Sequence, residues 1–160
     1  MKTIWAPWRI EYILGKKGPG CIFCDLPKED RDRDNVILYR AEHCFVIMNR
    51  FPYTGGHLMV VPYFHTSSFE GLSVEVLTEM MTLTTLSVEI LIEAMRPEGF
   101  NVGINIGQAA GAGIREHLHM HVVPRWVGDS SFMAVQDEVR VIPEHLLVTY
   151  DKLYPLFNRR

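Results

Sequence analysis

The chain has 160 residues, a formal net charge of −3 and 48% hydrophobic residues, which suits one ordinary globular domain. The absence of a basic stretch argues against a nucleic acid polymer as partner, and no apolar run is long enough to cross a membrane. Three cysteines are an odd count for a secreted disulfide framework, and the N-terminus does not resemble a signal peptide. We therefore expect a cytoplasmic protein.

Residues 1–20 predict an irregular N-terminal arm that carries Trp5 and Trp8. We expect these tryptophans to pack on the body of the domain; the alternative is that one of them lines a nucleotide pocket. The segment 27–35 is rich in charged residues and predicts a solvated connection.

Hydrophobic patterning then predicts five strands and two helices. The strands are expected at 36–39, 44–48, 58–62, 102–106 and 117–124. One long helix is expected at 73–95 and a terminal helix at 143–157, with short extended structure at 138–142. Because the strands cluster around one central helix instead of alternating with several, the predicted class is α+β with an antiparallel sheet.

Three histidines, His117, His119 and His121, alternate in the last predicted strand. Successive side chains on a strand point to opposite faces, so all three imidazoles are expected on one face and the apolar residues between them on the other. One buried histidine is common in a protein core. Three on one face are harder to accommodate there, because each needs its own hydrogen-bond partners.

A glycine-rich turn, 107–114, precedes the histidines. Small residues let backbone amides approach an anion, so the pair of features predicts a phosphate cradle beside a nucleophile. A neutral imidazole attacks phosphorus without a separate base. His119 is the expected nucleophile, with its other ring nitrogen donating to a backbone carbonyl, and His121 is the expected proton donor to the leaving group.

The spacing Cys21-x-x-Cys24 suits two corners of a tetrahedral zinc site. Two further ligands must then come from elsewhere in the chain, and His65 and His117 are the candidates. The alternatives are a redox pair or an unligated pair in the core. A redox pair of the thioredoxin type is expected in a βαβ pattern, which the sequence does not show.

Several motifs together resemble the histidine triad (HIT) superfamily. They are Cys21-Ile-Phe-Cys24, 49–57, 57–65, 101–107 and His117-Leu-His-Met-His-Val-Val. The stretch 116–126, with Gly128-Asp129 and Phe132-Met133 after it, is similar to the branch that includes bacterial diadenosine tetraphosphate phosphorylase-like enzymes. The resemblance covers residues from about 20 to 126 and implies a five-stranded antiparallel sheet with one long helix, paired as a homodimer.

The resemblance also implies a role for each matching residue. His119 would take a nucleotidyl group, His121 would contact the phosphate or leaving group, and His57 would support both. Asn49 would bind the ribose hydroxyls. The residues expected to hold phosphate oxygens are Asn105, Gly107, Gly111, Gly113, Ile114 and Arg115. The ligands of a structural Zn²⁺ would be Cys21, Cys24, His65 and His117. A Mg²⁺ or Mn²⁺ ion bound with the substrate is compatible with this set.

One departure from the family pattern lies just before the triad. Many HIT hydrolases carry Gly-Gln-Ser/Thr there, whereas this chain has 111–116, one residue longer and without Gln or Ser. The difference favours the phosphorylase-like branch and shifts the expected phosphate contacts to backbone amides and Arg115.

We therefore expect one HIT domain over 1–160, with an arm at 1–20 and a C-terminal extension at 127–160. Its expected activity is cleavage of dinucleoside polyphosphates through a nucleotidyl-histidine intermediate. The alternatives are a nucleoside phosphoramidate hydrolase of the same family and a non-catalytic nucleotide-binding domain.

Overall fold

The computed structural model describes residues 20–129 and 144–159. The expected N-terminal arm with Trp5 and Trp8, and the expected extended segment 138–142, lie outside the described residues. The described helices are α2 (Ile22–Asp25), η1 (Leu26–Lys28), α3 (Asp32–Asn35), α4 (Val74–Met95), η2 (Gln108–Ala110) and α6 (Leu146–Phe157). The strands are β1 (Ile37–Arg40), β2 (Cys44–Met48), β3 (Leu58–Pro62), β4 (Gly99–Ile104) and β5 (Met120–Arg125).

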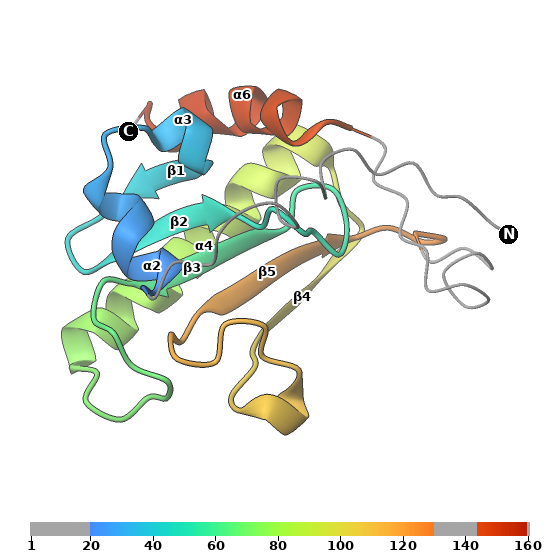
Figure 1. Cartoon of the computed structure of the whole chain (residues 1–160). Helices are drawn as coiled ribbons and strands as arrows, with labels where there is room; N and C mark the ends of the chain where they lie inside the picture. The colour runs from blue at the N-terminus through green and yellow to red at the C-terminus, as the bar shows by residue number, and fades with distance from the viewer. Residues whose placement is uncertain (1–19, 130–143, 160) are drawn as a thin grey trace, which may run out of the picture.

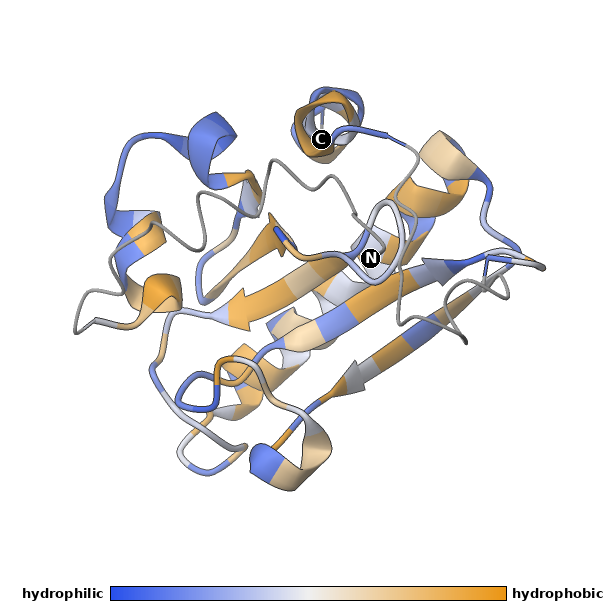
Figure 2. Cartoon of the chain, turned by 45° about the vertical axis from the view of Figure 1, so that its right-hand side comes forward, coloured by the Kyte–Doolittle hydropathy of each residue, from blue (hydrophilic) through white to orange (hydrophobic). Residues whose placement is uncertain are grey.

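The five strands form one antiparallel sheet in the order β1-β2-β3-β5-β4, as Figure 1 shows. Every residue of β2 and β3 is buried, so these strands are covered on both faces and show as apolar bands in Figure 2. β4 forms an outer edge and is largely exposed. The predicted α+β class with a five-stranded antiparallel sheet is confirmed.

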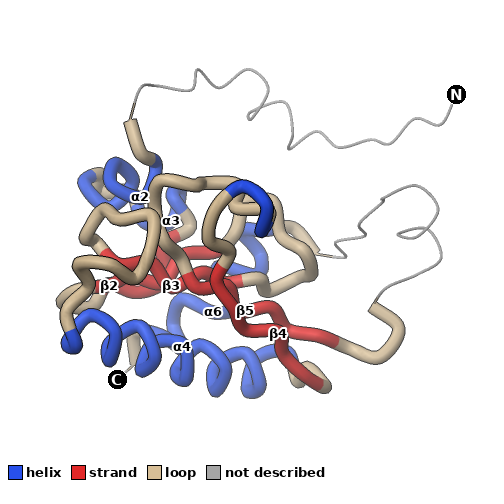
Figure 3. Tube along the Cα trace, turned by 90° about the horizontal axis from the view of Figure 1, so that it is seen from below, coloured by secondary structure: helices blue, strands red, loops and turns tan. Residues whose placement is uncertain are grey.

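The long helix α4 covers one face of the sheet, whereas α2 and α3 lie toward the other, as Figure 3 shows. The Ser73 side chain caps the start of α4 by accepting a hydrogen bond from the backbone amide of Val76. Arg96 adopts a left-handed conformation at the end of α4, directly before Pro97. No helix in the ranges 20–129 and 144–159 is long and apolar enough to cross a membrane.

The sequence predicts β2 and β3 to the residue, but it misplaces the two strands beside the histidines. The fourth strand spans Gly99–Ile104, not 102–106, and the fifth spans Met120–Arg125, not 117–124. The ladder between them ends at the pair Ile104–Met120. Before that pair the chain leaves the ladder, so His117 and His119 lie just ahead of β5, and His121 alone of the three lies in it.

Two further predictions need correction. The segment 27–35 is not simply a solvated connection, because it forms η1 and α3 and buries Asn35. The terminal helix begins at Leu146, and the side chain of His145 caps it by accepting a hydrogen bond from the backbone amide of Leu147. This helix packs on β1, where the Tyr150 hydroxyl donates to the carbonyl of Ile37 at 3.0 Å.

Candidate active site and metal site

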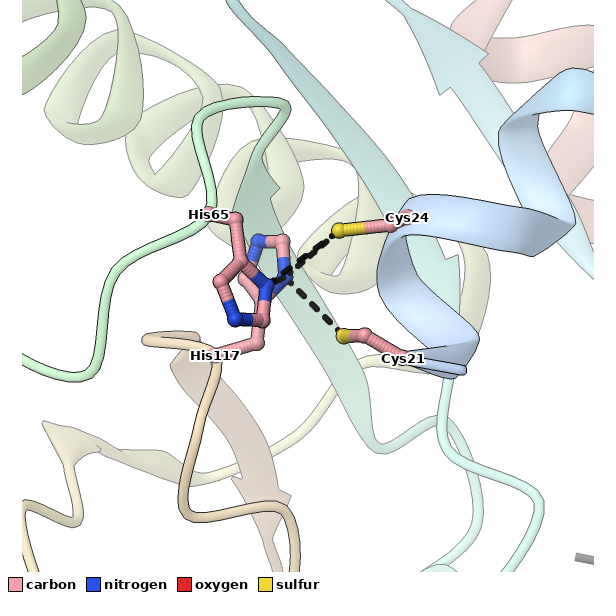
Figure 4. Close-up of side chains that lie close together, drawn as sticks. All are labelled: Cys21, Cys24, His65 and His117. Atoms are coloured by element: carbon pink, nitrogen blue, oxygen red, sulfur yellow. Dashed lines mark hydrogen bonds between the residues drawn. The ribbon is translucent and has the colours of Figure 1, made fainter. Parts of the chain in front are cut away.

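Four side chains from three separated segments converge beside the start of β5 (Figure 4). They are Cys21 and Cys24 of the first described turn, His65 after β3, and His117 before β5. Their ligand atoms all lie within 4.8 Å of one another, so this group can bind a metal ion. The structure thus brings together all four residues that the sequence marked as metal ligands.

The spacing of the ligand atoms fits a tetrahedral ion. Cys21 Sγ and Cys24 Sγ lie 3.2 and 3.5 Å from His117 Nδ1. The Nδ1 atoms of His65 and His117 lie 3.3 Å apart. Tetrahedral zinc bonds would place sulfur and nitrogen about 3.6 Å apart and two nitrogens about 3.4 Å apart. His117 Nε2 donates to the carbonyl of Pro62 at 2.8 Å, which leaves its Nδ1 lone pair free to bind a metal.

The His119 imidazole is oriented by the backbone of the neighbouring metal-site histidine. Its Nδ1–H donates to the carbonyl of His117 at 2.8 Å, and the ring is buried. Because a carbonyl can only accept, the proton of the neutral ring stays on Nδ1 and the lone pair stays on Nε2. Burial lowers the pKa of His119, so the neutral, nucleophilic form is favoured at neutral pH.

A second pair of imidazoles lies beside His119. The backbone amide of Tyr53 donates to His57 Nδ1 at 3.1 Å, and His57 Nε2 lies 2.9 Å from His121 Nδ1. His57 Nδ1 therefore accepts, and its Nε2–H donates to His121 Nδ1. By the same logic the proton of neutral His121 lies on Nε2. The centroids of the His119 and His121 rings are 4.7 Å apart, so the two imidazoles are direct neighbours.

The pKa of His121 is lowered to about 4, chiefly because the ring is buried and to a smaller extent because of the charge of the neighbouring His119. Since a histidine in the unfolded chain binds its proton near 6.5, unfolding takes up a proton between these values, and the free energy of unfolding falls as the pH falls. For this residue alone, the free energy of unfolding falls by roughly 2 kcal/mol between pH 7 and pH 5.

Urea unfolding of wild type and His121→Asn at pH 7 and pH 5 measures this change in the free energy of unfolding. We expect the variant to lose roughly 2 kcal/mol less than wild type over this range; an equal loss in both proteins contradicts the assignment.

The glycine-rich turn only partly matches its predicted form. Gly107 and Gly111 both have a φ of +80°. Side chains disfavour this backbone conformation, which explains why glycine occupies both positions. The amides of Gly111 and Ala112 donate to the carbonyls of Gln108 and Gly107, so they close the turn on itself. Arg115 Nη1 donates to the side chain of Gln108 at 3.2 Å. This interaction links the two ends of the turn.

Of the remaining predicted substrate residues, Asn49 contacts one of the histidines directly. Asn49 lies 3.4 Å from His57 Nδ1 through its amide nitrogen, and its carbonyl oxygen accepts from the amide of Phe51. Asn105 is half-buried just after β4, whereas Gly113 is exposed. Asn49 therefore helps to hold the loop that leads to His57.

Two aromatic residues at the site received no role from the sequence. The Tyr53 ring lies 4.5 Å from the His57 ring and 5.8 Å from the His121 ring, between centroids. Phe23 contacts the His117 and His119 rings at 5.5 and 5.0 Å. Tyr53 lies in the motif between Asn49 and His57, and Phe23 lies between the two cysteines. Their positions inside these motifs could have indicated a role at the site.

Comparisons with known proteins agree with this geometry. The family model described as HIT domain matches residues 30–127, which is more than half of the chain. The chain belongs to the HIT domain family. Its similarity to a Mycobacterium tuberculosis protein named AP-4-A phosphorylase reaches 35% identity over 155 residues, covering 91% of this chain and 79% of that protein.

Two solved HIT structures resemble this one closely. A Zn-bound histidine triad family protein from Mycobacterium smegmatis superposes with a TM-score of 0.70 and 27% identity, covering 88% of this chain and 94% of that one. A hypothetical histidine triad nucleotide-binding protein from Sulfolobus tokodaii gives a TM-score of 0.67 and 25% identity, covering 87% and 90%. The HIT fold predicted from the motifs is thereby confirmed.

Proposed function

We propose that this HIT protein cleaves dinucleoside polyphosphates by passing a nucleotidyl group through His119. One observation carries the proposal: Nδ1 of the buried His119 is committed to the carbonyl of His117, which leaves the Nε2 lone pair as a nucleophile on a ring that neighbours His121. The 35% identity to a protein named AP-4-A phosphorylase supports diadenosine tetraphosphate as the substrate to test first.

In the first step, His119 Nε2 attacks the α-phosphorus of one nucleotide. The new N–P bond replaces the bond from phosphorus to the bridging oxygen, and with diadenosine tetraphosphate the leaving group is ATP. His121 Nε2–H donates a hydrogen bond to that departing oxygen and keeps its proton, so ATP leaves as the anion. The imidazolium that forms at His119 keeps its Nδ1–H bond to the carbonyl of His117, which stabilises the positive charge.

In the second step, an acceptor oxygen attacks the same phosphorus and breaks the N–P bond. Inorganic phosphate as acceptor gives ADP, and water gives AMP. His119 then regains its neutral form. We propose phosphate as the acceptor, because the turn before the triad lacks the Gln and Ser/Thr typical of many HIT hydrolases.

The substrate contacts are proposed from the residues around this pair. Asn49 is proposed to bind the ribose hydroxyls. Asn105 and the turn from Gly107 to Arg115 are proposed to hold phosphate oxygens, with Gly113, Ile114 and Arg115 as the main contacts. The amides of Gly111 and Ala112 already bond within the turn, so they contribute less than the sequence suggested.

We propose Zn²⁺ as the ion at Cys21, Cys24, His65 and His117, because two thiolates and two imidazoles in tetrahedral spacing suit it. When bound, the ion would cross-link the three segments that meet there. The thiols must stay reduced to bind it, which supports the cytoplasm as the proposed location.

A homodimer is a further part of the proposal. The edge strand β4 and the turn after it expose Val102 and Ile106, and α4 exposes Met81 and Ile92. Within residues 20–129 and 144–159, no strand pairs with the outer edge of β4, and a strand edge that bears apolar side chains favours pairing with a second chain.

The acceptor is tested by incubating the protein with diadenosine tetraphosphate, with and without inorganic phosphate. We expect ADP and ATP in equal amounts, with ADP formation dependent on phosphate. AMP and ATP, formed at a rate indifferent to phosphate, would identify a hydrolase. Cleavage of adenosine phosphoramidate alone would favour the other HIT activity, and nucleotide binding without any product would reject the enzyme proposal.

A further inference from the structure

Phe23 lies between the two metal-site cysteines but points into the domain. It is the buried residue of α2, with 1% of its surface exposed, whereas its neighbour Ile22 is half exposed. The carbonyl of Cys21 accepts from the amides of Cys24 and Asp25 at 3.0 Å, so the turn that carries Phe23 is closed by its own backbone. The cysteine turn thus fixes where the Phe23 ring lies.

The Phe23 ring contacts two of the three triad histidines. It meets the His117 ring edge-on at 79° and the His119 ring at 56°, with centroids 5.5 and 5.0 Å away. The Phe23 ring also packs against the buried Phe45 ring, with centroids 6.5 Å apart. A single rigid ring therefore contacts both the imidazole of the candidate metal site and the imidazole proposed as the nucleophile.

The hydrogen bond from His119 Nδ1 fixes one edge of its imidazole, but one bond does not prevent the ring from pivoting about it. The contacts on the flanks restrict that pivot. The His121 ring stands at 71° to the His119 ring at 4.7 Å, and Phe23 provides a second aromatic contact at 5.0 Å. Phe23 and His121 come from different elements, α2 and β5.

We propose that Phe23 is a positioning residue for the reaction: held by the cysteine turn, its ring sets the orientation of the His119 imidazole. The proposal rests on the proposed role of His119 as nucleophile. Phe23 acts through that ring and not on the substrate, so its removal should lower kcat and leave KM little changed. A misdirected attacking atom costs rate steeply, by up to about a hundredfold for an error near 1 Å.

The test compares Phe23→Leu with Phe157→Leu. Phe157 is equally buried, but its described ring contact is with Tyr39 of β1 and not with a histidine. Both variants therefore remove one buried ring, and only Phe23→Leu removes a contact with His119. We expect similar drops in the thermal midpoint and unchanged metal content in both. We expect kcat for diadenosine tetraphosphate to fall about 10- to 100-fold in Phe23→Leu alone, with KM within about twofold. Phe23→Met, which fills more of the space, replaces Phe23→Leu if that variant does not fold.

A second readout needs no substrate. The ring nitrogen signals of His119, measured by NMR at neutral pH, report its tautomer and its rigidity. Wild type and Phe157→Leu should show the Nδ1–H form as a single sharp species, and Phe23→Leu should show broadened or averaged signals. If these signals change as expected while wild type does not cleave the dinucleotide, the proposed function fails and only the orientation of the His119 ring by Phe23 is supported. Wild-type kcat and His119 signals in Phe23→Leu, an equal kcat loss in Phe157→Leu, or a change confined to KM would each overturn the positioning role.

Discussion

His119→Ala is expected to lower kcat by at least about a thousandfold while the fold is retained. The variant removes the Nε2 lone pair that attacks phosphorus, and no other described side chain holds its equivalent in the same orientation. His121 cannot substitute, because its Nδ1 accepts from His57 and its Nε2 carries the proton. Steady-state kinetics with diadenosine tetraphosphate, together with circular dichroism and thermal unfolding, measures both parts of the expectation.

His43→Ala is the matched control, since His43 lies next to β2, outside the histidine group, and its side chain is about one-third exposed. We expect wild-type turnover from this variant. A folded His119→Ala protein that retains full activity would eliminate His119 as the nucleophile.

The double substitution Cys21→Ser and Cys24→Ser is expected to remove one bound metal ion per chain and to lower the free energy of unfolding by at least about 3 kcal/mol. The ion would join the first described turn to the segments after β3 and before β5, so its loss frees all three. Metal analysis after preparation without chelator, followed by urea unfolding, gives both quantities.

Cys44→Ala serves as the control for cysteine loss. Cys44 is fully buried in β2, and burial raises the pKa of its thiol to about 12, so it stays protonated and outside the metal group. This variant should keep its ion. A wild-type protein that carries no metal but has ordinary stability would refute the metal site.

The sequence was most informative where one interaction dominates. β2 and β3 are continuous apolar runs buried on both faces, and burial alone fixes their bounds. α4 has a capping serine at its start and a proline just past its end, so its prediction was close as well. The four candidate metal ligands were chosen from the Cys-x-x-Cys spacing and from two histidines beside predicted strands, and the structure brings all four together.

The sequence was less informative where the chain must satisfy two interactions at once. Alternation predicted that all three histidines lie on one strand, but His117 turns toward the cysteines and its neighbour Leu118 bonds to the carbonyl of Thr66. β5 therefore begins only after the chain has brought His117 to Cys21, Cys24 and His65. Likewise, glycine content predicted backbone amides that cradle a phosphate, but it could not show that the amides of Gly111 and Ala112 bond within the turn.

The links between the histidines were also beyond the sequence. That His57 donates to His121 depends on the Tyr53 amide, and the position of this amide comes from the loop conformation rather than from residue type. The resemblance to the family could place His57 near the triad. It could not show that His57 is the donor and His121 the acceptor of the hydrogen bond between them.

The stereochemical course at phosphorus tests the central claim most directly. A dinucleotide made chiral at the attacked α-phosphorus by sulfur and an oxygen isotope is cleaved with wild-type protein, and the configuration of the product is compared with that of the substrate. Two in-line displacements, first by His119 and then by the acceptor, predict overall retention. Inversion would mean that the acceptor attacks the dinucleotide directly and that no nucleotidyl-histidine lies on the path.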